Sequence, residues 1–109
     1  MLARAQTKYV RISPRKARLA ADLVRGLPVE QAEIQLKFCR LKAGRLIQKT
    51  LDSAVANAET QLGLARENLK VQEIRVDVGP VLKRAKSKNK GGKVPVMKRT
   101  SHFTIVVGA

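Results

Sequence analysis

The chain has 109 residues, and 23 Lys and Arg side chains against eight Asp and Glu give it a formal net charge of +15 at pH 7. This length suits one domain with one modest core. The chain contains no run of about 18 apolar residues and begins without the apolar stretch of a signal peptide, so we expect a cytoplasmic protein with no membrane partner. The charge predicts a polyanionic partner, because each cation placed on a phosphate releases condensed counterions.

The sequence offers little that would support catalysis, a disulfide or a metal site. Cys39 is the only cysteine, so an internal disulfide is excluded and we expect a small buried or half-buried apolar residue. His102 is the only histidine, and no acidic residue near it in sequence completes a catalytic triad or a metal site. Paired carboxylates and a nucleotide-binding glycine loop are also absent from the sequence. We therefore predict that the protein is not an enzyme and uses no cofactor.

The first predicted elements are a short strand and a helix. The strand lies in "KYVRI", residues 8–12. The period then becomes helical in "ISPRKARLAADLVRG", where Ser13 can cap the start, Pro14 suits the first helical position and Gly26 suits a left-handed exit. The apolar side chains expected on one side of this helix are Ala20, Leu23, Val24 and Leu27.

Three cations, Arg15, Lys16 and Arg18, crowd the first turn of this helix. Cations are mildly unfavourable there in a free protein, because they meet the positive end of the helix dipole. A bound phosphate would reverse this effect, and the free backbone N–H groups of a helix start also attract anions. We therefore predict a phosphate contact at this turn, in preference to a solvated helix end.

Two further helices are predicted, one from Pro28 to about Phe38 and one over residues 42–62. The earlier of them places four small or apolar residues on one face, namely Val29, Ala32, Leu36 and Cys39. The later one has a continuous apolar stripe and should be the core helix; its members are Ala43, Ile47, Leu51, Ala54, Val55 and Ala58.

The polar side of the core helix carries Lys42, Arg45 and Lys49 in its early turns. These cations form either a solvated face or a second phosphate contact, and the sequence favours neither. Asn57 lies within or beside the apolar stripe, where Asn is a poor helix former. We expect its side chain to form a hydrogen bond with the backbone.

After Gly63 the hydrophobic period shortens to two, which is typical of half-buried strands. The segment "EIRVDVGP" alternates apolar and charged residues, and "HFTIVVG" repeats this pattern. Leu69 and Val71 are out of register with Ile74, which indicates a bulge or a bend near Gln72. The apolar residues that should face the core are Ile74, Val76, Val78, Phe103, Ile105 and Val107.

Between these strands lies a basic segment, "KRAKSKNKGGKVPVMKR", which holds eight cations and no acid. Its two halves can extend the strands as a ribbon with arms of about 10 to 12 residues, projecting some 30 to 40 Å. A lone two-stranded ribbon is at best marginally stable in water, so we expect it to be partly disordered in the isolated protein and to become ordered when it binds a folded RNA. The predicted RNA contacts here are Lys83, Arg84, Lys86, Lys88, Lys90, Lys93, Lys98 and Arg99.

Four motifs together resemble the large-subunit ribosomal protein family numbered twenty-two in the bacterial series. They are "ISPRKARLAADLVRG", "KAGRLIQKTLDSAVANAE", "VDVGPVLKRAK" and "KRTSHFTIVV", in the same order and spacing, and the resemblance covers nearly the whole chain. It implies an α+β fold with three helices packed on a small three-stranded antiparallel sheet and a long protruding β-hairpin. It also implies a place at the peptide exit tunnel, with the hairpin lining the tunnel wall.

The resemblance also implies particular contacts with large-subunit rRNA. These fall on Arg15, Lys16, Arg18, Lys83, Arg84, Lys98, Arg99, Thr100, Ser101 and His102. The hairpin tip, about 85–95, would lie nearest the nascent polypeptide, through Ala85, Lys88, Asn89, Lys90, Gly91, Gly92 and Lys93. Two departures from the family pattern are Val78, where Glu is common, and a tip that is richer in Lys and Gly.

We expect a single domain over residues 1–109, with a body at about 1–78 and 101–109 and a hairpin at about 79–100. The expected partners are large-subunit rRNA, the nascent polypeptide and neighbouring ribosomal proteins of a bacterial or organellar ribosome, without homo-oligomerisation. The alternative from another class is an architectural DNA-binding protein with basic β-ribbon arms. The mass in solution and competition between RNA and DNA would separate the two.

Overall fold

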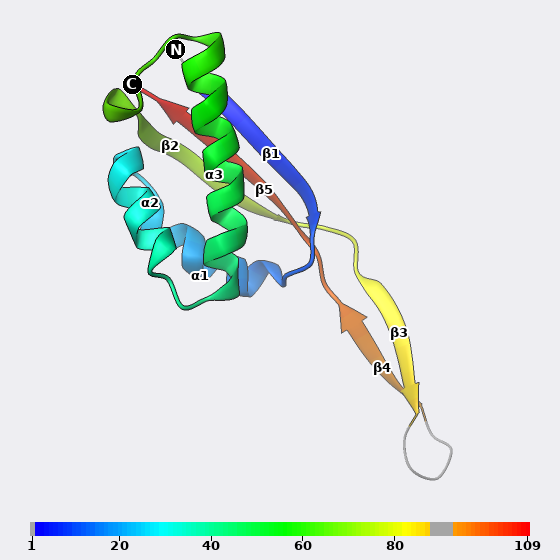
Figure 1. Ribbon diagram of the computed structural model, residues 1–109. Helices are drawn as coiled ribbons and strands as arrows, with labels where there is room; N and C mark the ends of the chain where they lie inside the picture. The colour runs from blue at the N-terminus through cyan, green and yellow to red at the C-terminus, as the bar shows by residue number, and fades with distance from the viewer. Residues whose placement is uncertain (1, 88–92) are drawn as a thin grey trace.

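The computed structural model describes residues 2–87 and 93–109, with the backbone alone for 84–87 and 93–96. Helices pack on a three-stranded sheet, and a separate two-stranded hairpin extends away from this body (Figure 1). The elements in chain order are β1 (Leu2–Val10), α1 (Pro14–Val24), α2 (Val29–Lys37), α3 (Lys42–Gln61), the 3-10 turn η1 (Arg66–Asn68), β2 (Lys70–Val78), β3 (Leu82–Ser87), β4 (Lys93–Lys98) and β5 (Ser101–Gly108). The predicted α+β class is confirmed.

Helix α1 begins and ends as its sequence predicts. The Ser13 side-chain oxygen accepts a hydrogen bond from the Lys16 backbone N–H at 3.3 Å, and Gly26 has a φ of +80°. Its buried side is formed by Pro14, Ala17, Ala20, Ala21 and Val24. The prediction for Leu23 is wrong: its side chain is 48% exposed, because it lies to one side of the row that faces the sheet.

Helices α2 and α3 confirm the predicted apolar faces. Every member of the α3 stripe is buried, and Cys39 is half-buried beside the core. The Asn57 side chain donates a hydrogen bond to the Arg4 carbonyl at 3.0 Å, as expected for a polar residue at the edge of the stripe. This bond joins α3 to the outer edge of β1.

The sheet has the order β1-β5-β2, so the last strand in the chain lies at its centre. Both neighbours run antiparallel to β5, and Phe103 lies opposite Thr7 on one side and Val76 on the other. Phe103, Ile105 and Val107 are buried against the helices, as predicted. The first strand was predicted at residues 8–12, but β1 runs from Leu2 to Val10. The prediction began too late, because Leu2 to Thr7 also pair with β5, and it ended two residues too far along the chain.

Strand β2 confirms the predicted bulge, since its register with β5 shifts between Val71 and Glu73. Ile74 and Val76 face the core as expected. The prediction for Val78 is wrong: its side chain is 65% exposed at the end of the strand, beyond the helices that cover Ile74 and Val76.

The hairpin is a sheet of its own and does not continue the body sheet, which corrects the expected unbroken ribbon. β3 and β4 pair antiparallel from Leu82 with Lys98 to Ser87 with Lys93. Residues 79–81 and 99–100 interrupt the strands on either side of the boundary. The molecule is accordingly elongated, with principal extents of 62 × 25 × 16 Å.

None of the helices among residues 2–87 and 93–109 combines the length and hydrophobicity needed to cross a membrane.

Candidate nucleic-acid interface

The boundary between body and hairpin is held by buried polar contacts. The Thr100 hydroxyl donates to the Pro80 carbonyl at 2.6 Å, and the Ser101 hydroxyl donates to the Ile12 carbonyl at 2.7 Å. The Gly79 N–H donates to the Thr100 carbonyl at 3.0 Å. Thr100 is 3% exposed and Ser101 is 0% exposed. In this structure both side chains act inside the protein and fix the chain that leads into β5.

His102 also has an internal partner. Its Nδ1 accepts a hydrogen bond from the Tyr9 backbone N–H at 3.0 Å, and the Tyr9 ring meets the imidazole edge-on at 5.0 Å between centroids. Tyr9 has a φ of +58°, which is uncommon for a residue with a Cβ, and it lies where the register of β1 with β5 shifts. The half-buried His102 thus supports the bulge that ends β1.

Replacing Gly79 by Ala should destabilise this boundary by about 1–3 kcal/mol, because a Cβ there would press into the Thr100 hydroxyl. Thr100 cannot move aside without breaking its bond to Pro80. Urea unfolding checks this. In a Thr100→Ala background, Gly79→Ala should lower the free energy of unfolding by much less. An equal loss in both backgrounds would contradict a clash with the Thr100 hydroxyl.

Cations from four segments surround this boundary. Arg11, Lys16, Lys42, Lys98 and Arg99 line one open groove, and Arg15 lines a neighbouring hollow that shares Lys16 and Arg99. All are exposed, and none forms an ion pair with a described acidic residue. We call this set the junction surface: Arg11, Arg15, Lys16, Lys42, Lys98 and Arg99.

The acidic residues lie elsewhere. Arg66 pairs with Glu33 at 2.7 Å and with Glu59 at 3.5 Å, beyond the far end of α3. Arg75 lies near Glu73 and Asp77 along β2. Surface pairs of this kind, each with at least one exposed partner, add little stability, but they neutralise charge locally. No acidic residue is found among the described residues that line the junction hollows, so positive charge is concentrated there.

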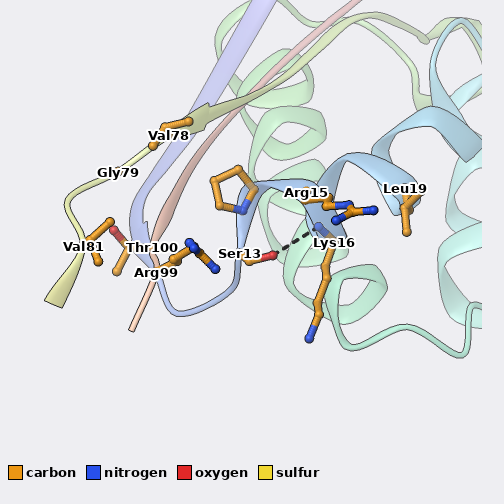
Figure 2. Close-up of a pocket in the computed structure, with 10 residues that line it drawn as sticks. Ser13, Arg15, Lys16, Leu19, Val78, Gly79, Val81, Arg99 and Thr100 are labelled. Atoms are coloured by element: carbon orange, nitrogen blue, oxygen red, sulfur yellow. Dashed lines mark hydrogen bonds between the residues drawn. The ribbon is translucent and has the colours of Figure 1, made fainter. Parts of the chain in front are cut away.

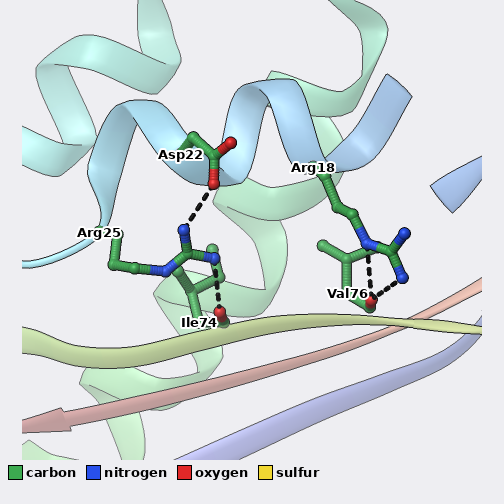
Figure 3. Close-up of polar contacts among 5 residues, drawn as sticks. All are labelled: Arg18, Asp22, Arg25, Ile74 and Val76. Atoms are coloured by element: carbon green, nitrogen blue, oxygen red, sulfur yellow. Dashed lines mark hydrogen bonds and ion pairs between the residues drawn. The ribbon is translucent and has the colours of Figure 1, made fainter. Parts of the chain in front are cut away.

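Arg18 differs from the other two cations of its turn. Its Nε and Nη2 donate to the Val76 carbonyl at 3.3 and 3.1 Å, and Arg25, the residue that follows α1, donates to the Ile74 carbonyl at 3.1 Å (Figure 3). These carbonyls lie on the free edge of β2. Because an open strand edge invites pairing with another chain, the two arginines protect the sheet as well as fastening α1 to it.

The structure describes some predicted hairpin sites with their side chains, some by their backbone alone and some not at all. Lys83 is exposed at the start of β3, and Arg84, Ala85, Lys86 and Lys93 belong to the backbone of β3 and β4. The predicted sites that lie outside the described residues are Lys88, Asn89, Lys90, Gly91 and Gly92. Lys98 and Arg99, at the base of the hairpin, line the same hollows as the cations of the body and so belong to the junction surface.

The sequence predicted only that Arg11 faces solvent or a partner, without naming it as an RNA contact, and it left the role of Lys42 open. Arg11 follows β1 and Lys42 begins α3, so only the packing of these ends against α1 brings them to Lys16. The one available signal was the proximity of Arg11 to the cluster "SPRKAR" in sequence.

A protein-family model described as ribosomal protein L22p/L17e matches residues 5–108. The chain belongs to this family. The resemblance inferred from the four motifs is therefore confirmed, and the L22p/L17e family is one of structural ribosomal proteins, not of enzymes.

The chain is similar to proteins named large ribosomal subunit protein uL22 in several bacteria. It is 70% identical to that of Protochlamydia amoebophila (strain UWE25) over 105 residues, which cover 96% of this chain and 95% of the relative. The identity is 59% with the Chlamydia pneumoniae protein and 55% with that of Chlamydia trachomatis serovar L2, at the same coverage. These L22p/L17e relatives align along the body and the hairpin alike.

Proposed function

We propose that the protein is a constituent of the large ribosomal subunit in the bacterial cytoplasm, where it binds large-subunit rRNA and supports subunit assembly. The observation that carries the rRNA contact is the junction surface, where exposed cations from four segments converge without an acidic neighbour. Such a surface suits the phosphates of a folded RNA. Family membership supports the same conclusion.

Within this proposal the contacts come from two sources. Arg15, Lys16, Lys98 and Arg99 bind phosphates on the junction surface, and the lysines of the hairpin continue the contact outward. Arg18, Thr100, Ser101 and His102 act mainly by holding the backbone that presents these cations. Recognition is mainly by RNA shape and backbone, because the chain has only three aromatic residues on which bases could stack.

The hairpin tip is proposed to line the nascent-peptide tunnel, and the body to touch neighbouring ribosomal proteins. A photo-crosslinker at residue 89 in assembled subunits should reach both rRNA and a stalled nascent peptide. Crosslinks to rRNA alone would remove the tunnel contact and leave the rRNA contact in place.

Binding of the protein to large-subunit rRNA should weaken steeply with salt. Six to ten phosphate contacts would lose about three to five orders of magnitude in affinity between about 50 and 200 mM salt, with the duplex DNA slope as a guide. Filter binding across this range measures the slope. A nearly flat response would contradict the phosphate contacts, and equal affinity for duplex DNA would contradict the choice of RNA.

A further inference from the structure

A hollow with apolar walls opens within the junction surface. It lies between the start of α1 and the chain that links β2 to β3, and its apolar walls are formed by Pro14, Leu19, Val78 and Val81 (Figure 2). Its volume is about 540 Å³, within the usual range for sites that hold small ligands. Arg15 and Arg99 also line it.

The apolar walls are poorly covered by the protein itself. Val78 is 65% exposed, Leu19 is 59% exposed and Val81 is 37% exposed. Scattered surface apolar residues need no explanation, but these three converge on one hollow. A phosphate alone would satisfy the arginines and leave the apolar walls in water.

We propose that this hollow holds one unstacked nucleobase of the bound rRNA, with an adjoining phosphate on Arg15 and Arg99. A nucleotide joins an apolar planar face to an anion, and the hollow offers apolar walls beside cations. Arginine is suited to both parts, because its planar guanidinium binds phosphate through a fork of donors and also stacks on bases. Proteins commonly recognise RNA through bases that have left the helical stack.

This inference rests on the proposed rRNA contact and adds a single base to it. The hollow has no aromatic wall among its described residues, so apolar contact with the valines and Leu19 replaces ring stacking. An apolar segment of a neighbouring protein is the competing occupant. The surrounding positive charge without an acidic residue favours the nucleotide, which brings its own anion.

The test compares the full-length protein with a Val78→Ser/Val81→Ser variant on deproteinised large-subunit rRNA. Both positions are exposed, so the variant should unfold in urea like the parent. We expect about threefold to tenfold weaker binding from the lost apolar contact, with an unchanged salt slope because no phosphate contact is removed. Dimethyl sulfate should modify at least one unpaired base in the variant complex that the parent protects.

A Leu23→Ser/Ile34→Ser variant is the matched control, since these exposed residues line a different apolar hollow between α1 and α2. It should bind deproteinised rRNA like the parent. An equal loss in the control would overturn the proposal, as would unchanged affinity and footprint in the valine variant. A loss seen only in subunits that carry their other proteins would overturn it in favour of a protein segment. If the parent itself fails to bind rRNA, the proposed function fails first.

Discussion

Replacing Arg15, Lys16 and Arg99 together by Gln is expected to weaken rRNA binding by about two to three orders of magnitude at about 0.1 M salt. The reason is that each cation that meets a phosphate contributes about 0.7 to 0.9 to the slope of log affinity against log salt. The slope should therefore fall by about 2 to 3 in the same variant. These exposed side chains stabilise the fold little, so urea unfolding should be almost unchanged.

The control for this variant removes the same charge elsewhere. Arg4, Lys37 and Lys70 are exposed and lie away from the junction hollows. Their replacement by Gln should reduce affinity only weakly, through the general field of the protein. If this variant lost as much affinity as the first, net charge and not the junction surface would govern binding.

Replacing Phe103 by Ala should destabilise the fold by about 3–5 kcal/mol. Phe103 is 1% exposed at the centre of β5, where both neighbouring strands and the helices surround it. Since small domains are stable by only about 5–15 kcal/mol, much of this margin would be lost. Chemical denaturation followed by circular dichroism measures the change.

The other phenylalanine supplies the comparison. Phe38 is 74% exposed after the end of α2, and its ring lies 5.9 Å from the Lys37 ammonium. Phe38→Ala should therefore change the free energy of unfolding by no more than about 0.5 kcal/mol. If both substitutions lowered the free energy of unfolding by a similar amount, Phe103 would not be a residue of the buried core.

The helices were predictable because their signals are local. Ser13, Pro14 and Gly26 bound α1 in the sequence as in the structure, and the α3 stripe needs only the helical period. Strands β2 and β5 were predicted from the alternation of their residues. Strand β1 was predicted only in part, because "LARAQT" has small and polar residues whose strand conformation depends on pairing with β5.

The site was less predictable, because its geometry depends on residues far apart in sequence. Nothing near Arg18 in sequence indicates that it binds the carbonyl of Val76, and nothing near Ser101 indicates a bond to Ile12. Sequence patterns reveal charge but not which cations the fold already uses. The alternation of β2 predicted that Val78 faces the core, but its side chain is exposed. The alternation does not show how far along the strand the helices cover the sheet.

The central place of β5 has a consequence for how the protein is made. β1 and β2 do not pair with each other in this sheet, and each finds its partner in Ser101–Gly108, which follow every other element in the chain. During translation the early strands must therefore wait, with their apolar residues uncovered, until the basic hairpin and β5 have emerged. Pairing Leu2 with Gly108 then closes one of the longest loops available, which slows the final step. In a newly made chain the basic hairpin is therefore synthesised before the strand that completes the core.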